Sequence, residues 1–447
     1  MYIPYTSTAL LLTSVAIVSV SVIDALPALI PCASASNGKS DRWGICGGDA
    51  KSPISLRGSN YIRLGGSNVP SCTGLYHTTF DTGVYNRTRY IFAFEAMQRQ
   101  GYNVARVFLD ERVGCGIGGA ANAAEPLDPT WLDRLAQFVS DAEAHGLYTL
   151  VTMVYTPSNA YFNNVTKRIP QDAAWDTGGW NTNFLTARGH KGYETYGSLL
   201  AEGLKTRLSI DAQHAVIISL QNEFFLRGDL FPFTHNATVD SFANGVAYDM
   251  RSPEDRQEAA DANTNAWASK LSKAIRSYLP STLVTVGVFT YAAVQKHGPN
   301  GLIAVGCGPS TRNLKSHIDC RFPARPYKLS QSGIDFLDVH IYEADGSPQA
   351  LAANLKTEEW HKIPKSKPII MGEFGCNSKW YPNATVCSPH VRQLQISSCA
   401  AGFTSWLFWT YDSNNVQRDW YDMIGDDGAI NFVLSPTNNP HPCEKKA

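Results

Sequence analysis

The chain has 447 residues and a formal net charge of −1, and 17% of its residues are charged. Hydrophobic residues make up 44% of the chain, which is enough to bury a large core and excludes an intrinsically disordered protein. The near-neutral charge, without a basic run, excludes the electrostatic footprint of a nucleic-acid binder.

The first segment with a clear pattern is an apolar run over residues 9–23, which is typical of a secretory signal. The small-residue run Ala33-Ser34-Ala35 fits a cleavage site and predicts that residues 1–35 are a signal peptide. Asp24 ends the apolar run early, so a cut near Ala25 is the alternative. An uncleaved signal anchor is a third interpretation, although 15 apolar residues are short for a membrane span. We expect a secreted, extracellular protein without stable membrane association.

Four N-glycosylation sequons agree with passage through the secretory pathway, and they predict a glycoprotein. The sequons begin at Asn86, Asn164, Asn236 and Asn383.

Ten cysteines without a CxxC pair favour disulfides over zinc ribbons or thioredoxin-type sites. A cut after Ala35 removes Cys32 and leaves nine cysteines, whereas a cut near Ala25 keeps all ten. The connectivity is open, and we predict the short-loop pairs Cys307–Cys320 and Cys376–Cys387, and then the pair Cys72–Cys115.

Short apolar runs then alternate with longer amphipathic stretches, which predicts parallel strands separated by helices. Asp128 and Pro129 supply an N-cap and a first-turn proline for the second helix. In chain order, the predicted strands are 54–61, 103–109, 147–154, 215–220, 282–289, 336–341, 368–371 and 405–409. The predicted helices are 87–100, 128–145, 190–207, 253–278, 347–358 and 388–400.

Eight strands of this kind predict an α/β fold, a single catalytic domain over residues 36–447 built as a (β/α)₈ barrel with long βα loops. Continuous apolar strands suit a barrel, because a parallel sheet is buried on both faces. Region 290–333 holds Gly, Pro and two cysteines and shows no clean helix. A doubly wound open sheet is the competing fold. We expect a monomer.

Two glutamates follow apolar strands, and in such a barrel the active site lies at the carboxyl ends of the strands. Glu223 comes after the fourth strand and Glu373 after the seventh. Taken alone, either glutamate has the alternative interpretation of a solvated loop residue, but the barrel places both at the same mouth. Cleavage of a glycosidic bond requires two facing carboxyl groups, because one donates a proton and the other attacks the anomeric carbon.

The ordered set of strand-end motifs between residues 54 and 412 resembles glycoside hydrolase family 5, the cellulase and mannanase family. The resemblance implies a retaining barrel enzyme with Glu223 as acid/base and Glu373 as nucleophile. The motifs are Leu56-Arg57-Gly58-Ser59-Asn60-Tyr61, Gly101-Tyr102-Asn103-Val104-Ala105-Arg106-Val107, Asn222-Glu223, Val339-His340-Ile341-Tyr342, Pro368-Ile369-Ile370-Met371-Gly372-Glu373-Phe374-Gly375 and Trp406-Leu407-Phe408-Trp409.

The resemblance also implies how the two carboxylates are tuned. Arg106 and a hydrogen bond from Tyr342 would keep Glu373 ionised. The charge of Glu373 would in turn raise the pKa of Glu223, so that Glu223 holds a proton. The alternative role for Arg106 is that of a structural ion-pair partner.

Three further residues are predicted to bind substrate. Asn222 would hydrogen-bond the sugar 2-OH, His340 would line the same subsite, and Trp409 would stack beneath the sugar. The alternatives are a satisfied core histidine at His340 and a core aromatic at Trp409, with Trp406 facing inward instead.

Two departures from the family pattern leave the sugar specificity open. Phe224 follows the Asn-Glu pair where the family usually has Pro, and the third strand, Val151-Thr152-Met153-Val154-Tyr155, ends without a His. Trp175, Trp180 and Trp380 are candidates for outer sugar subsites, with loop packing as the alternative.

No cofactor or metal is predicted. Gly114-Cys115-Gly116-Ile117-Gly118-Gly119 matches GxGxxG, but Pro126 and Pro129 separate it from the next helix, so it lacks the helix N-terminus that a dinucleotide needs. HExxH, GxSxG and P-loop motifs are absent from the sequence.

The sequence therefore predicts a secreted retaining β-glycoside hydrolase. Its substrate would be a β-1,4-linked polysaccharide or oligosaccharide, mannan or glucan, cleaved by double displacement through a glycosyl-enzyme intermediate. Endo action is favoured; an exo-acting β-glycosidase and a catalytically inactive glycan-binding barrel are the alternatives.

Overall fold

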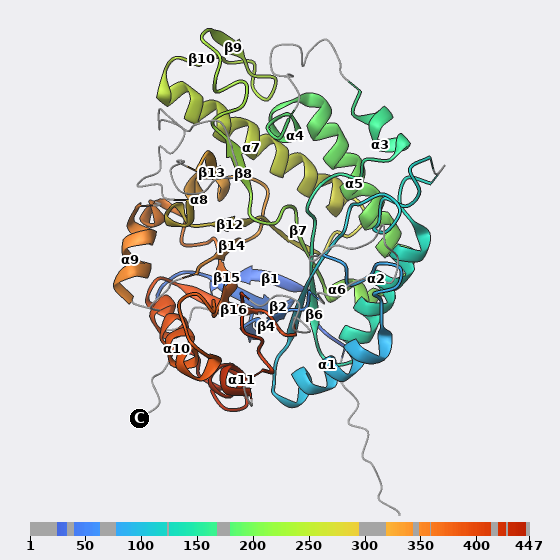
Figure 1. The fold of residues 1–447 in the computed structure, drawn as a ribbon, viewed down its shortest axis with the longest axis vertical. Helices are drawn as coiled ribbons and strands as arrows, with labels where there is room; N and C mark the ends of the chain where they lie inside the picture. Colours follow the sequence, from blue (N-terminus) through green and yellow to red (C-terminus); the bar gives the residue numbers. More distant parts are fainter. Residues whose placement is uncertain are drawn as a thin grey trace, which may run out of the picture.

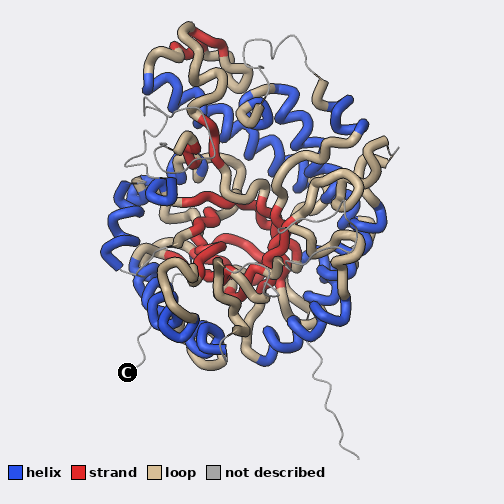
Figure 2. Tube along the Cα trace, in the orientation of Figure 1, coloured by secondary structure: helices blue, strands red, loops and turns tan. Residues whose placement is uncertain are grey.

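The computed structural model describes residues 25–33, 40–62, 77–122, 125–167, 179–294, 319–342, 348–357, 359–412, 419–425 and 428–443. Strands form a ring at the centre of the molecule and helices enclose them (Figure 2). All neighbouring strands of this sheet are parallel, in the order β11-β7-β6-β5-β4-β16-β15-β14-β12.

The ring closes through a single extended run. β11 (Leu283–Thr285) pairs with β7, β12 (Gly287–Phe289) pairs with β14, and only Val286 separates the two. The nine strand segments are therefore eight chain runs, and the predicted (β/α)₈ barrel is confirmed. The other segments are β4 (Arg57–Asn60), β5 (Val104–Phe108), β6 (Tyr148–Thr152), β7 (Val216–Ser219), β14 (Leu337–His340), β15 (Ile369–Gly375) and β16 (Phe403–Trp409).

Helices cover the outside of the ring (Figure 1). Side-chain caps begin several of them; Asp128 accepts from the amide of Trp131 at the start of the second helix, with Pro129 in its first turn. The longer helices are α1 (Arg87–Arg99), α2 (Pro129–Glu143), α5 (Ala187–Lys205), α7 (Pro253–Arg276), α9 (Pro348–Thr357) and α10 (Ala384–Ala400). The shorter ones are α3 (Ala160–Val165), α4 (Thr182–Leu185), α6 (Ile210–His214), α8 (Pro326–Leu329) and α11 (Ala429–Leu434). None of the described helices is long and apolar enough to cross a membrane.

The first strand is shorter than predicted. Residues 57–60 form the barrel strand, whereas β3 (Pro53–Ile54) belongs to a separate antiparallel sheet with β1 (Leu29–Cys32) and β2 (Gly44–Gly47). A Pro in a central strand would remove a ladder hydrogen bond, so its place in a small peripheral sheet is expected.

This three-stranded sheet, which we call the amino-terminal plug, closes one end of the barrel. A disulfide joins Cys32 to Cys46, and the Tyr148 hydroxyl donates to the Pro27 carbonyl at 3.0 Å. One apolar cluster contains both plug residues and residues from the amino-terminal ends of the strands: Leu29, Ile45, Leu56, Val104, Tyr148, Leu150, Ile217, Leu283, Phe336, Ile370 and Leu407.

Long βα segments build up the opposite end. Between β7 and α7 lie β8 (Phe225–Arg227) and the hairpin of β9 (Thr238–Asp240) and β10 (Ala247–Asp249). The described part of region 290–333 holds only the short elements η4 (Tyr291–Val294), β13 (Arg321–Pro323) and α8, and β13 pairs with β8. A short 3₁₀ helix, η6 (Trp360–Lys362), follows α9.

Of the predicted disulfides, Cys376–Cys387 is confirmed. The pairs Cys307–Cys320 and Cys72–Cys115 each include a residue, Cys307 or Cys72, outside the described ranges. The sequence did not predict Cys32–Cys46, because Cys32 lay in the predicted signal peptide, or Cys399–Cys443, whose cysteines lie 44 residues apart.

Candidate active site

The carboxylates of Glu223 and Glu373 lie close together at the carboxyl-terminal mouth of the barrel. With His340 they form a group in which one ligand atom of each residue lies within 4.8 Å of the others. Glu373 sits within β15 and is 3% exposed, whereas the side chain of Glu223 is 35% exposed. One carboxylate is therefore enclosed by protein and the other faces the open mouth.

The backbone at Glu223 is held in an unusual conformation. Its φ of 43° lies in the left-handed region, which costs a residue other than Gly about 1–3 kcal/mol. Hydrogen bonds on both sides fix it, from the Phe224 amide to the Gly287 carbonyl at 2.8 Å and from the Gly287 amide to the Gln221 carbonyl at 3.0 Å. The fifth barrel strand therefore fixes the direction in which Glu223 projects.

Both carboxylate oxygens of Glu373 accept hydrogen bonds from predicted site residues. Arg106, fully buried in β5, donates to Oε1, and the Tyr342 hydroxyl donates to Oε2 at 2.7 Å. Arg106 also donates to the side-chain oxygens of Asn60 at 2.8 Å and Asn222 at 3.0 Å. One guanidinium thus orients the Glu373 carboxylate and the Asn222 amide together.

His340 bridges the two carboxylates. Its Nδ1 lies 3.2 Å from Glu223 Oε1 and 3.4 Å from Glu373 Oε2. Burial lowers the pKa of His340, but the charges of Glu373 and Asp338 and the hydrogen bond to Glu223 outweigh burial and raise this pKa to about 9. At neutral pH the imidazole is therefore a cation between two acids.

The resting pKa directions of the two acids are the reverse of those predicted. Burial raises the pKa of Glu373, although the charges of His340 and Arg106 oppose the shift. Burial also acts to raise the pKa of Glu223, but the hydrogen bond and charge of His340, with the charges of Arg321 and Arg106, leave this pKa below its usual value. The prediction neglected His340, whose hydrogen bond favours the charged form of Glu223.

Sequence reasoning missed Asp338, a carboxylate buried within β14. Its Oδ2 lies 3.8 Å from Arg106 Nη2, and its Oδ1 lies 3.7 Å from His340 Nε2. Gly372 provides the space, because a Cβ at this position would lie 1.7 Å from Asp338 Oδ1. An acidic residue inside an otherwise apolar strand was the available signal.

Asn60 is a second residue that the sequence analysis quoted only as part of a motif. It is fully buried at the end of β4, and its Nδ2 donates to the Gly372 carbonyl at 3.0 Å and the Phe408 carbonyl at 3.1 Å. These bonds fix the oxygen of Asn60 toward Arg106.

The two tryptophans of the eighth strand face opposite ways. Trp406 points outward, where its Nε1 donates to Ser398 Oγ of α10 at 2.8 Å. Trp409 is 7% exposed and packs edge-on against Phe108 in a small cluster at the mouth, which also includes Tyr342. Trp409 is therefore the tryptophan of this strand that lies in the mouth with Tyr342.

The three tryptophans that were predicted to form outer sugar subsites differ in their surroundings. Trp175 lies outside the described residues. Trp180 stacks on Phe225 at 4.4 Å and donates to the Phe225 carbonyl at 2.8 Å, which is loop packing. Trp380 is 47% exposed.

Glu223, His340 and Glu373 are also the group of described residues whose spacing could hold a metal ion. Both oxygens of Glu373 are already hydrogen-bonded, and the cations of Arg106 and His340 already balance the carboxylates. A divalent cation would have to displace these contacts.

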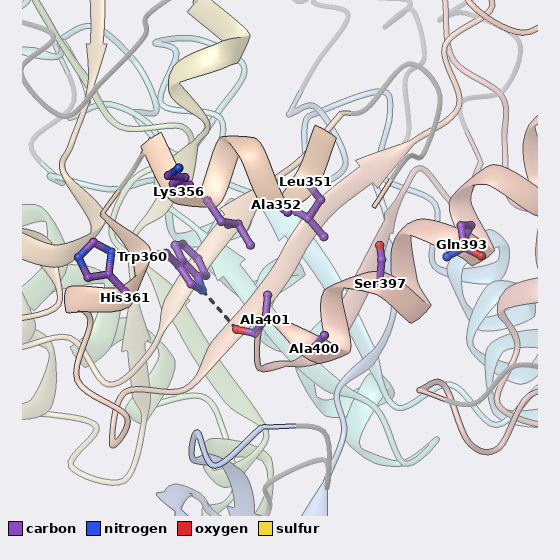
Figure 3. Close-up of a pocket in the computed structure, with 10 residues that line it drawn as sticks. Leu351, Ala352, Lys356, Trp360, His361, Gln393, Ser397, Ala400 and Ala401 are labelled. Atoms are coloured by element: carbon purple, nitrogen blue, oxygen red, sulfur yellow. Dashed lines mark hydrogen bonds between the residues drawn. The ribbon is translucent and has the colours of Figure 1, made fainter. Parts of the chain in front are cut away.

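A separate hollow of about 710 Å³ lies between α9, η6 and α10 (Figure 3). Leu351, Leu355 and Ala400 line it, and the Trp360 Nε1 donates to the Ala401 carbonyl at its wall. It contains none of the predicted site residues and no pair of carboxylates.

A parallel barrel with two carboxylates at its carboxyl-terminal mouth is the architecture of a large class of glycoside hydrolases. The family model described as Cellulase (glycosyl hydrolase family 5) matches residues 70–415. The chain belongs to this family and is a glycoside hydrolase, as the strand-end motifs predicted.

Solved structures share the fold at low sequence identity. The endo-1,4-β-mannanase from Rhizomucor miehei has a TM-score of 0.55 at 14% identity, covering 93% of this chain and 100% of that chain. The endo-β-1,4-mannanase from Thermotoga petrophila has a TM-score of 0.52 at 17% identity, covering 88% and 78%. The exo-β-1,4-mannosidase Op5Man5 from Opitutaceae bacterium strain TAV5 has a TM-score of 0.52 at 16% identity; the match spans 88% of this chain and only 61% of that one. The search of curated proteins found no significant match.

Proposed function

We propose that the protein hydrolyses β-1,4-linked mannan or glucan within the chain, with retention of anomeric configuration. The observation that carries this proposal is the separation of the carboxylates, whose oxygens lie within 4.8 Å of each other. Retaining enzymes hold their carboxyl groups about 5–5.5 Å apart, whereas inverting enzymes need about 6.5–9.5 Å to admit a water.

In the first step Glu223 donates its proton to the glycosidic oxygen while a carboxylate oxygen of Glu373 attacks the anomeric carbon. The bond from the anomeric carbon to the leaving oxygen breaks, and an ester bond to Glu373 forms. In the second step Glu223 takes a proton from water, the water oxygen attacks the anomeric carbon, and the Glu373 carboxylate is released.

The environment of Glu223 supports this change of role. A bound sugar would cover its exposed side chain, and removal of water raises the pKa of a carboxyl group as the acid role requires. When Glu373 becomes an ester its negative charge disappears, so the pKa of Glu223 falls and the base role is favoured.

Arg106, Asn222, Tyr342, His340 and Trp409 are the residues that we assign to the sugar at the cleavage point. Arg106 binds the oxygen of Asn222, which leaves the Asn222 Nδ2 to donate to a sugar hydroxyl. Trp409 offers an apolar surface at the mouth for one ring face.

Two other activities remain candidates. An exo-acting β-glycosidase is favoured by the likeness to the exo-β-1,4-mannosidase, and it would release single sugars from chain ends. A catalytically inactive glycan-binding barrel is the other candidate. The conjunction of both acids with Arg106 and Tyr342 favours catalysis, because a binder needs no ionised nucleophile.

We further propose that the protein is a secreted glycoprotein and a monomer. The disulfides Cys32–Cys46, Cys376–Cys387 and Cys399–Cys443 suit an oxidising compartment, and the asparagine of each sequon is exposed.

Of the two cleavage positions in the signal region, we favour the one near Ala25. A cut after Ala35 would remove Leu29, which is buried in the plug, and Cys32, which is disulfide-bonded. Amino-terminal sequencing of the secreted protein distinguishes the two positions.

A screen of soluble mannan, glucan and xylan with a reducing-sugar readout tests the activity. Glu373→Gln and Glu223→Gln should each lower the rate by more than about 10³-fold, because each removes a group that acts in the transition state. Glutamine keeps an oxygen for Arg106 or His340, and the exposed Glu202→Gln on α5 is the matched control. Proton NMR of the first product should show the β-anomer. Wild-type rates in Glu373→Gln, or an α-anomer as first product, would contradict the mechanism.

A further inference from the structure

A short two-stranded sheet begins beside Glu223 and carries an arginine. β13 pairs antiparallel with β8, and β8 begins at Phe225, two residues after Glu223 (Figure 1). Successive side chains of a strand point to opposite faces, and in this pair Leu226 and Phe322 both enter the main apolar core. Phe225 and Arg321 therefore lie on the other face of the small sheet.

The Arg321 guanidinium contacts two aromatic rings. Its Cζ lies 5.8 Å from the centre of the Phe225 ring and 5.4 Å from the centre of the Phe289 ring, and such rings attract a cation. Phe289 ends β12, two residues after Gly287, whose backbone fixes that of Glu223. The cation therefore contacts both the strand that follows Glu223 and the strand that anchors it.

Asp319 is the counter-charge of Arg321. Its carboxylate accepts hydrogen bonds from Arg321 Nη2 at 2.8 Å and from Arg321 Nε at 3.1 Å. The side chains of Arg321 and Asp319 are 42% and 28% exposed, so water screens the pair and the pair contributes little to the free energy of unfolding. Substitution of either residue should therefore change the local charge with little loss of stability.

Several charged or titratable side chains surround the Glu223 carboxyl group. Burial acts to raise the pKa of Glu223, but the hydrogen bond and charge of His340 and the charges of Arg321 and Arg106 leave this pKa below its usual value. Arg106 and His340 are fully buried, whereas Arg321 reaches Glu223 from the open side of the mouth. Among the described residues, the groups that act on Glu223 or on which it acts are His340 of β14, Arg321 of β13, Arg106 of β5, Glu373 of β15, Tyr342 after β14 and His77 before α1.

We propose that Arg321, with Asp319 as its counter-charge, is a positioning residue that sets how readily Glu223 holds the proton it gives to the leaving sugar. This inference rests on the proposed hydrolase function and deepens it, because the acid of the first step must be protonated before the glycosidic bond breaks. A cation beside a carboxyl group favours the charged form. Arg321 therefore confines the acid role to lower pH and favours the base role of Glu223 in the second step.

The test is the pH dependence of kcat/KM on soluble mannan or glucan. Arg321→Gln should raise the pKa of Glu223 and move the alkaline limb to higher pH by about half a unit, whereas Asp319→Asn should move it to lower pH. Arg321→Lys keeps the charge and should leave the limb within about 0.2 unit of its place. Arg227→Gln is the matched control, because Arg227 lies opposite Arg321 in the same sheet and its guanidinium binds Asp229.

Carbon-13 NMR of the side-chain carboxyl groups, with Glu223→Gln to assign the signal, follows the titration of Glu223 without turnover. The same opposite displacements are expected, and both should shrink in about 1 M salt because Arg321 is partly exposed. An unmoved titration in Arg321→Gln and Asp319→Asn, displacements of the same sign, or an equal displacement in Arg227→Gln would overturn the role of Arg321 while the hydrolase function stands. No hydrolysis of mannan or glucan by the unmodified protein would overturn the proposed function, and the NMR titration would still decide the role of Arg321.

Discussion

The two ends of the barrel are built from different chemistry. At the amino-terminal end, the plug and the strand ends bury a continuous apolar cluster, closed by the Cys32–Cys46 disulfide. At the carboxyl-terminal end, Arg106, Asp338, His340 and Glu373 are all buried within one site. Burying apolar groups stabilises the fold, whereas burying charges is costly unless each has a partner. The comparison teaches that one end of the barrel stabilises the fold and the other holds reactive groups.

The charged end also stores backbone strain beside its buried charges, whereas the positive-φ residue of the plug, Ala50, lies in an exposed turn. Glu223 has a positive φ and depends on the Gly287 contacts to maintain it. Strain of this kind persists only where surrounding structure fixes it, and it concentrates at functional sites. Substitutions at the two ends should therefore have separable effects on stability and on activity.

The largest separable effect is expected at the plug. Leu29→Ala removes a side chain that is 3% exposed, and it should lower the free energy of unfolding by about 2–5 kcal/mol. The kcat of the folded fraction should stay unchanged, because the plug lies at the end of the barrel opposite to Glu223 and Glu373. Urea denaturation with parallel rate measurements checks both. Val386→Ala, at an exposed position of α10, is the control. A fall in kcat matching the loss of stability would show that the two ends are coupled.

A smaller effect on stability is expected from His340 as the pH changes. The pKa of His340 is raised from 6.5 to about 9, so its contribution is fully present below pH 6.5 and is lost as the pH rises through about 9. The loss over this window amounts to as much as about 3 kcal/mol. Denaturant midpoints at pH 6, 7.5 and 9 measure it.

His340→Asn should flatten that dependence without removing it. Burial and the neighbouring Asp110 raise the pKa of Asp81 to about 8, so Asp81 also loses a stabilising contribution as the pH rises. The difference between the two proteins isolates the part due to His340. An identical slope in both proteins would show that His340 is uncharged at neutral pH.

The difference between the two ends of the barrel also explains which features the sequence could predict. Apolar runs such as residues 147–154 and 215–220 identified the strands, because a parallel barrel requires continuous burial. Glu223 and Glu373 were found because they follow such runs, and the barrel brings strand ends together. This rule placed the principal acids without any knowledge of side-chain contacts.

Features that depend on contacts between residues distant in sequence could not be predicted in the same way. Asp338 lies inside a strand, and only the structure brings it between Arg106 and His340. Trp420 is brought to Tyr342 by the pairing of residues 419–421 with the segment after β15. The plug was not predicted, because Leu29 and Cys32 lie in a segment whose composition indicated a signal peptide. The lowered pKa of Glu223 has the same kind of origin, in its contact with His340, whereas burial raises the pKa of Glu373.

The smallest expected effect concerns Asp338, and it tests whether buried charges at the mouth act through their neighbours. Asp338→Asn keeps the size of the side chain but removes the negative charge beside Arg106 and His340. The pKa of His340 should fall, because the charge of Asp338 helps to raise it. The ionisation of Glu223 depends on the charge of His340, so the alkaline limb of the kcat/KM profile should be displaced in this variant.

Asp261→Asn is the matched control, since Asp261 is also buried and ion-paired, with Arg325 on the outside of the barrel. It should reduce stability and leave the pH profile in place. A role for Asp338 in packing alone predicts a uniform loss at every pH, as in any destabilised variant. A displaced alkaline limb in Asp338→Asn, absent from Asp261→Asn, requires that the charge of Asp338 acts on Glu223 and Glu373 through His340.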